Sequence, residues 1–154
     1  MSGNTSKRWV TGFEPWHLDA LNFRAREAQI FKKIDRNADA QVKATQRGTA
    51  FTGFSEEGII GCAGIVPVWR GVGHAWVVLG KDYKAHRIWM HKQVVAFQEK
   101  IIAGMNLHRV EATVMCEFTP GVQWLERMGF QLEGKKRKYG PDGKDHYSYA
   151  RIIE

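Results

Sequence analysis

Cysteine and long apolar stretches are scarce in this 154-residue sequence. The two cysteines, Cys62 and Cys116, lie in strand-like apolar segments, with no CxxC spacing and no nearby pair of histidines. The sequence therefore predicts two buried thiols, no disulfide bridge and no metal site. No run approaches the ~18 consecutive apolar residues of a membrane span, and residues 1–10 lack the apolar core of a signal peptide. We therefore expect a cytoplasmic protein.

Acidic residues are also few. The sequence has 16 Asp and Glu against 23 Lys and Arg, a formal net charge of +7. This balance favours a polyanionic partner such as nucleic acid, a ribosome or a phosphorylated cofactor. The densest basic run is Lys135, Lys136, Arg137 and Lys138. We interpret it as the solvated face of an edge strand, with an RNA contact as the alternative.

Hydrophobic residues make up 44% of the chain, which is enough to build one buried core at this length. We therefore predict a single domain over residues 1–154. Residues 1–8 are small and polar, and we expect them to form a loose terminus.

The first half of the chain changes from helical to strand-like patterning. A short strand is predicted at 8–12, and apolar spacings of three and four indicate one broken helix or two short ones over 15–36. Residues 35–48 are polar and predict a loop or a weak helix. Three runs rich in Val, Ile and aromatic residues, 50–54, 58–66 and 73–79, then predict a three-stranded meander.

The second half begins with a long amphipathic helix, predicted over 84–105. Its expected apolar stripe is Ile88, Val94, Val95, Phe97, Ile101 and Ile102, and its expected polar side is Lys92, Gln98 and Lys100. A strand follows at 109–115, with alternating apolar residues.

The last segments are a short helix and a hairpin. Thr119 before Pro120 predicts a helix start capped by the Thr oxygen, and Gly129 predicts its end after Met128. Strands at 131–139 and 146–153 flank a Pro-Asp-Gly turn, so the chain should close with a hairpin. The element order predicts a mixed α/β fold.

A local motif near the C-terminus resembles a known protein family. The stretch 124–130 (WLERMGF), followed by LEG at 132–134 and YAR at 149–151, resembles the GNAT superfamily, the N-acyltransferases that use acetyl-CoA. It looks like the C-terminal half of members that acetylate protein N-termini. The resemblance spans 48–153 by element order. It implies a mixed, mostly antiparallel central sheet flanked by helices, with a C-terminal hairpin.

The resemblance also implies acetyl-CoA as the acyl donor. In the family, the pantetheine arm pairs with the strand before the long helix, and the pyrophosphate rests on backbone amides at the helix start. The corresponding cofactor-binding residues in this sequence are Leu79, Lys84, Ala85, His86, Arg87, Ile88 and Trp89, with Thr119 where relatives carry Asn or Ser. Ala85, Arg87 and Trp89 replace the family's glycines. The Trp89 indole would crowd the pyrophosphate unless its ring turns into the core.

The transfer needs a base for the attacking amine and an acid for the departing thiolate. His74 stands about where many members carry a Glu that acts through water, and Glu111 is the second candidate base. In the family a Tyr of the short helix often acts as the general acid. Leu125 stands at that place in this sequence, and Tyr139 or Tyr147 of the hairpin could supply the acid instead. His74 and Glu111 can also be ordinary strand residues.

The function implied is therefore acetyl transfer from acetyl-CoA to a primary amine of a small molecule or protein. One alternative is a catalytically inactive GNAT-like interaction or assembly module, since degenerate domains of this kind resemble small proteins of tailed bacteriophages, including virion components. Such a protein would act in the virion or the host cytoplasm. A second alternative is a basic RNA- or ribosome-associated binding module.

Overall fold

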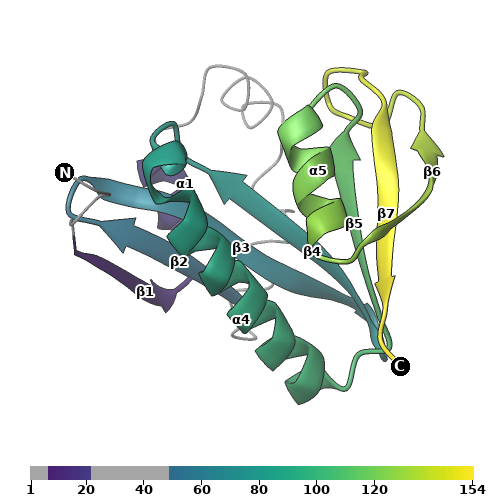
Figure 1. Ribbon diagram of the computed structural model, residues 1–154, viewed down its shortest axis with the longest axis horizontal. Helices are drawn as coiled ribbons and strands as arrows, with labels where there is room; N and C mark the ends of the chain where they lie inside the picture. The colour runs from purple at the N-terminus through teal and green to yellow at the C-terminus, as the bar shows by residue number, and fades with distance from the viewer. Residues whose placement is uncertain (1–6, 22–48) are drawn as a thin grey trace.

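The computed structural model describes residues 7–21 and 49–154. Within them the strands form one mixed sheet in the order β1-β2-β3-β4-β5-β7-β6 (Figure 1). The strands are β1 (Arg8–Gly12), β2 (Ala50–Ser55), β3 (Gly58–Trp69), β4 (Val72–Leu79), β5 (Arg109–Met115), β6 (Gln131–Lys136) and β7 (His146–Ile152). All neighbours pair antiparallel except β4 and β5, which are parallel. The predicted mixed α/β class, with a mostly antiparallel sheet flanked by helices, is confirmed.

Helices cover both faces of this sheet. They are α1 (Trp16–Ala20), α4 (Arg87–Met105), which the 3-10 helix η1 (Tyr83–His86) precedes, and α5 (Thr119–Arg127). Successive residues of β3 contact different helices, because Cys62 packs with Leu18 of α1 whereas Ala63 packs with Val94 of α4. Since neighbouring side chains of a strand point to opposite faces, α1 and α4 lie on opposite sides of the sheet.

Most predicted elements are present. The strands at 8–12 and 109–115 have the predicted bounds, and the three-stranded meander and the closing hairpin are confirmed. The predicted helical region 15–36 contains α1, which ends before the extended Leu21. Residues 1–6 and 22–48, which include the predicted loop at 35–48, lie outside the described residues. The predicted loose terminus and the predicted strand overlapped at Arg8, which begins β1.

The predicted apolar stripe of the long helix was partly wrong. The buried residues of α4 are Met90, Val94, Gln98 and Ile102, at a strict spacing of four, whereas Ile88 is 66% exposed. Gln98 is buried because Arg151 of β7 donates a hydrogen bond to its Oε1 at 3.1 Å. A buried amide with a partner costs little, so a contact distant in sequence allows Gln98 to share the buried side with Val94 and Ile102 of the predicted stripe.

The start of α5 also differs from the prediction. Thr119 is already helical and exposed, Phe118 takes the N-cap position, and no side chain caps the helix. The predicted Thr119 cap is therefore wrong, whereas the predicted end is confirmed: Gly129 has a φ of +91°, which favours glycine.

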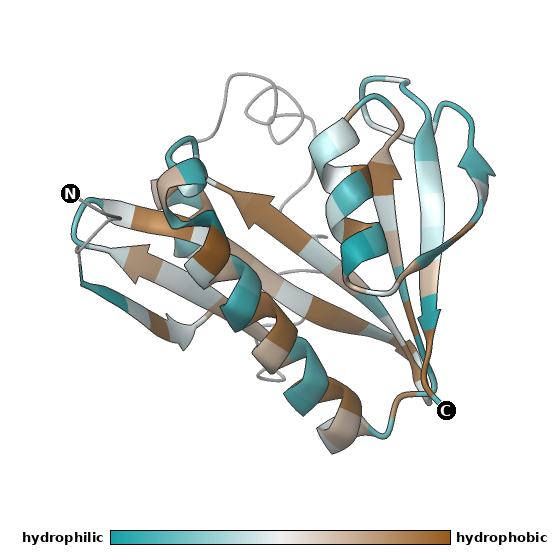
Figure 2. Cartoon of the chain, viewed as in Figure 1, coloured by the Kyte–Doolittle hydropathy of each residue, from teal (hydrophilic) through white to brown (hydrophobic). Residues whose placement is uncertain are grey.

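The two ends of the sheet differ in polarity. Figure 2 shows apolar residues concentrated on β3 and β4 near α4, whereas β6 is polar and, by its burial, exposed along its whole length. As predicted, Lys135 and Lys136 lie on an edge strand. In the described ranges, no helix combines the length and apolar character needed to cross a membrane.

Candidate functional site

The strands β4 and β5 stay together for only part of their length. Their pairing covers Val72–His74 of β4 and ends at His74 opposite Glu111, although β4 continues to Leu79 and β5 to Met115. Beyond His74, β4 therefore has a strand neighbour on its β3 side alone. Alternate backbone N–H and C=O groups of a strand point to each side, so this edge offers hydrogen bonds to an extended ligand.

A cleft of about 620 Å³ occupies the space between the separated strands. Its lining is largely apolar and comes from both strands and from the helices α4 and α5. It includes Ala75, Val77 and Leu79 of β4, Ala112 and Val114 of β5, Val94 and Phe97 of α4, and Gly121, Trp124 and Leu125 of α5. An apolar channel with one free strand edge suits a slender ligand that has amide groups along its length.

The segment after β4 brings cations to the start of a helix. Lys84 and Ala85 in η1 and Arg87 at the start of α4 are exposed, as is Lys81 just before them. The loop is anchored by the backbone N–H of Gly80, which donates to the carbonyl of Ile60 at 2.8 Å. Positive side chains beside helical N–H groups favour an anionic group at this end of the molecule.

The indole of Trp89 packs against the sheet. A Cβ atom at Gly53 of β2 would lie 3.0 Å from its Cζ3, and the guanidinium carbon of Arg8 lies 5.7 Å from the ring centroid. Trp89 packs with the buried cluster that includes Met90 and does not line the cleft. Of the two orientations that the sequence left open, the ring therefore takes the one directed into the core.

Three further predicted cofactor residues also lie outside the lining of the cleft. His86 is buried, and its Nε2 lies 3.6 Å from Oε2 of Glu57 in the turn between β2 and β3. Ile88 and Thr119 are exposed, and neither lines the cleft. Of the predicted cofactor residues, Leu79 is the one that lines it.

His74 lies where the two strands begin to separate, and it lines the cleft. Burial lowers the pKa of its imidazole, Glu111 partly opposes this effect, and Lys136 adds to it. The ring is therefore neutral at pH 7, with a nitrogen able to accept a proton.

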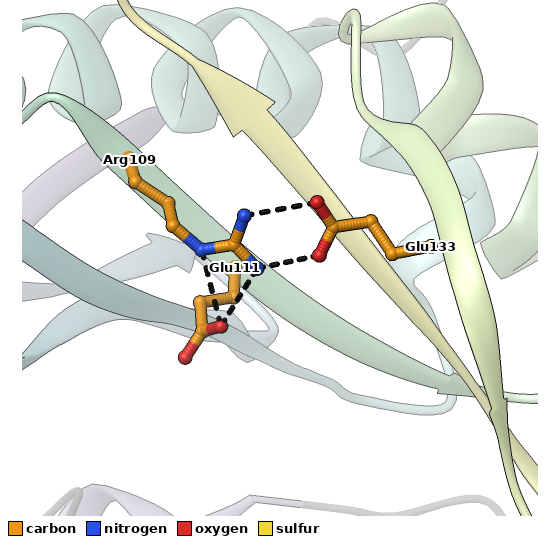
Figure 3. Close-up of polar contacts among 3 residues, drawn as sticks. All are labelled: Arg109, Glu111 and Glu133. Atoms are coloured by element: carbon orange, nitrogen blue, oxygen red, sulfur yellow. Dashed lines mark hydrogen bonds and ion pairs between the residues drawn. The ribbon is translucent and has the colours of Figure 1, made fainter.

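Glu111 points into an ion-pair cluster (Figure 3). Arg109 donates to its Oε2 from Nη2 at 3.0 Å and from Nε at 3.3 Å. The same guanidinium binds both oxygens of Glu133, at 2.9 and 2.5 Å, so it joins β5 to β6. These bonds raise the pKa of Arg109 and lower that of Glu133. Glu111 does not line the cleft.

Tyr139 lines the cleft beside a residue that the sequence did not single out. Its ring centroid lies 5.3 Å from that of His146, which also lines the cleft, and 4.6 Å from Nζ of Lys136. Burial lowers the pKa of His146, opposed by Asp142 and assisted by Lys136. The register between β5 and β7 places His146 opposite Met115, so only the correct strand pairing could have revealed it.

The sequence analysis also missed a hydrogen bond between α4 and α5. Trp124 of α5 donates from Nε1 to Nδ1 of His91 in α4 at 2.8 Å. The two residues are 33 positions apart, and no local pattern connects them. Because Trp124 lines the cleft, the bond holds the two helical walls at a fixed separation.

Solved structures with the same architecture were found at low sequence identity. A ribosomal-protein-S5-alanine acetyltransferase from Vibrio fischeri is 18% identical, with a TM-score of 0.68 and 97% coverage of both chains. A GNAT-family acetyltransferase from Bacillus anthracis is 21% identical, with a TM-score of 0.68 over 99% of this chain and 98% of that one.

A third structure contains a ligand. It is a ribosomal L7/L12 alpha-N-protein acetyltransferase in complex with coenzyme A, 16% identical, with a TM-score of 0.65 over 99% of this chain and 97% of that one. No family model and no curated protein matches the sequence. The likeness to the solved structures shows that the chain has the fold of the GNAT acetyltransferases.

Proposed function

We propose that this protein is an acyl-CoA-dependent N-acyltransferase that transfers an acetyl group from acetyl-CoA to a primary amine. The observation that carries this proposal is the separation of β4 from β5 after His74, which opens an apolar cleft beside a free strand edge. A fold neighbour that covers nearly the whole chain is a complex with coenzyme A.

The cleft and the loop after β4 would bind different parts of the cofactor. The free edge of β4, from Ala75 to Leu79, suits the two amides of a pantetheine arm. The segment from Lys84 through Ala85, His86, Arg87 and Ile88 to Trp89 would hold the pyrophosphate, through its backbone amides and the charges of Lys84 and Arg87. The inward Trp89 ring leaves that surface uncovered. Thr119 is the proposed hydroxyl contact at the start of α5.

Two side chains that line the cleft can move protons. Acetyl-CoA supplies the thioester whose acyl group the amine attacks. His74, neutral at pH 7, would accept the proton of the amine, and Tyr139 would return a proton to the thiolate. We assign Glu111 an indirect role, because its charge raises the pKa of His74 while Arg109 holds its carboxylate.

Ligand binding tests the proposal. A ligand that binds only the native state raises its stability, by about 2.7 kcal/mol at a concentration of 100 times Kd. We expect acetyl-CoA to raise the melting temperature. Val77→Trp, which fills the cleft, should abolish that rise. The matched control is Val68→Trp, because Val68 is a similarly exposed valine on β3 outside the cleft.

Absence of any shift at millimolar acetyl-CoA would contradict the enzyme and support the inactive interaction module. An RNA- or ribosome-binding module predicts instead an affinity that falls steeply with salt and is lost when Lys135 to Lys138 are reversed in charge.

Catalysis is tested separately from binding. His74→Ala should lower the rate of acetyl transfer to a primary amine by about 10²-fold, because general base catalysis contributes roughly that much. The acetyl-CoA melting shift should remain. Equal rates for His74→Ala and the wild type would show that His74 is not the general base, and the proposed cofactor site would be unaffected by that result.

A further inference from the structure

A separate groove of about 570 Å³ lies beside β1 and α1. Most of its wall is aromatic, and none of its described lining residues also lines the cleft. The residues that matter for its chemistry are Trp9, Phe13, Glu14, Trp16, His17 and Phe54. The proposed transferase activity uses none of them.

The rings form a connected set. Trp9 stacks on Phe54, with centroids 5.6 Å apart and planes 4° apart, and His17 meets Phe54 edge to face at 5.4 Å. Trp16 lies across His17 at 4.2 Å. Trp9 is nevertheless 40% exposed and Trp16 54% exposed. Neighbouring exposed indoles that line one hollow are typical of a binding surface rather than of a core.

The charge of the groove is opposite to that of the whole protein. Among the described residues that line it, Glu14 carries a carboxylate and none is Lys or Arg, in a chain that has 23 of them. Burial lowers the pKa of His17, with Glu14 opposing, so this ring is neutral at pH 7. Arg8 is directed to the other face, toward Trp89.

Hydrogen bonds hold the carboxylate and the rings in place. The backbone N–H of Glu14 donates to Nδ1 of His17 at 3.0 Å, and Nε1 of Trp16 donates to Oε2 of Glu14 at 3.1 Å. His17 is itself fixed by Thr52, whose Oγ1 lies 2.8 Å from Nδ1. The groove is therefore formed before any ligand enters, which lowers the cost of ordering it.

We propose that this groove binds a small organic cation, an ammonium group with methyl or other alkyl substituents. The faces of aromatic rings attract such a cation, and its alkyl groups bury apolar surface against them. The Glu14 carboxylate complements the charge. A neutral aromatic ligand would gain nothing from that carboxylate, and an anion would be repelled by it.

The test compares choline with its neutral analogue of the same shape, 3,3-dimethyl-1-butanol (called dimethylbutanol below), by isothermal titration calorimetry on the full chain. Choline should bind saturably, and dimethylbutanol should bind at least about tenfold more weakly, because it lacks the charge that the rings and Glu14 recognise. Equal affinities, or no saturable binding of choline, would overturn the proposal.

Variants place the ligand. Trp16→Ala should weaken choline binding about tenfold, and Glu14→Gln should weaken it several-fold. Trp69→Ala is the control, because Trp69 is 72% exposed on β3 but does not line the groove. Circular dichroism confirms the fold of each variant. Should Trp16→Ala unfold, Glu14→Gln decides alone. Unchanged affinity in the folded variants would show that the cation binds elsewhere.

Discussion

The two parts of the sheet are built differently. In the part formed by β1 to β4, the central strands are buried on both faces, and β3 pairs with β4 from Gly61 opposite Leu79 to Trp69 opposite Val72. In the part formed by β5 to β7, β6 is exposed throughout. The strand pairing between the two parts is short and ends at His74 and Glu111. The cleft exists because this connection is short.

Contacts at the closed end explain why the parts stay together. The backbone N–H groups of His108 and Arg109 both donate to the carbonyl of Gly71, at 2.8 and 3.2 Å. Arg151 of β7 reaches Gln98 and also bonds Oε1 of Glu99 in α4 at 2.6 Å. The boundary between β4 and β5 is thus closed at one end and open at the other, and its open end leaves room for a ligand.

The largest expected difference between the two parts is the loss of stability when a strand glycine is replaced by alanine. A Cβ atom at Gly64 of β3 would lie 2.6 Å from Cβ of Ala50 and 2.7 Å from the carbonyl oxygen of Thr49. Gly64→Ala should therefore lower the free energy of unfolding by about 3 kcal/mol, because backbone atoms cannot yield cheaply. Urea denaturation measures this.

The matched control is Gly134→Ala in β6, where a Cβ atom would meet nothing within 4 Å. Its effect should stay within about 0.5 kcal/mol. Similar losses at both positions would mean that the two parts are packed equally tightly.

The next effect concerns the pH dependence of stability due to His74, which lies on β4 at the end of its pairing with β5. Its lowered pKa means that the unfolded chain binds a proton more readily than the native protein. Stability is therefore complete above the unfolded pKa of about 6.5 and falls as the pH drops toward the native pKa. His74→Gln should remove up to about 1.4 kcal/mol per pH unit from this decline. Urea curves at several pH values measure the slope, and identical slopes in both proteins would contradict the prediction.

The smallest effect concerns the ion pairs that hold the hairpin part. Arg109→Met should cost about 1 kcal/mol, since the Arg109 bonds to Glu111 and Glu133 are partly shielded and bidentate. Lys144→Met, which breaks the half-exposed pair with Glu117, should cost less than about 0.5 kcal/mol. Thermal denaturation compares the two, and a larger loss for Lys144→Met would contradict the assigned roles.

Local patterns predicted much of the fold. Alternation over 109–115 and the apolar runs of the meander reflect how a strand buries alternate or successive side chains. Gly129 ends a helix for reasons that lie within a few residues. The burial of Gln98 in α4 was mispredicted because Arg151, far along the chain, gives its amide a partner.

The sequence by itself determined the types and order of the described elements, the basic character of the edge strand and the position of His74 near the start of the strand that leads to the long helix. Only the tertiary structure decided that β4 and β5 separate after His74, that Tyr139 and His146 reach the cleft, and that Trp89 turns into the core. It also brought Trp9 and Phe54 together around Glu14. Strand register and ring orientation depend on contacts between residues distant in the chain, which no local pattern contains.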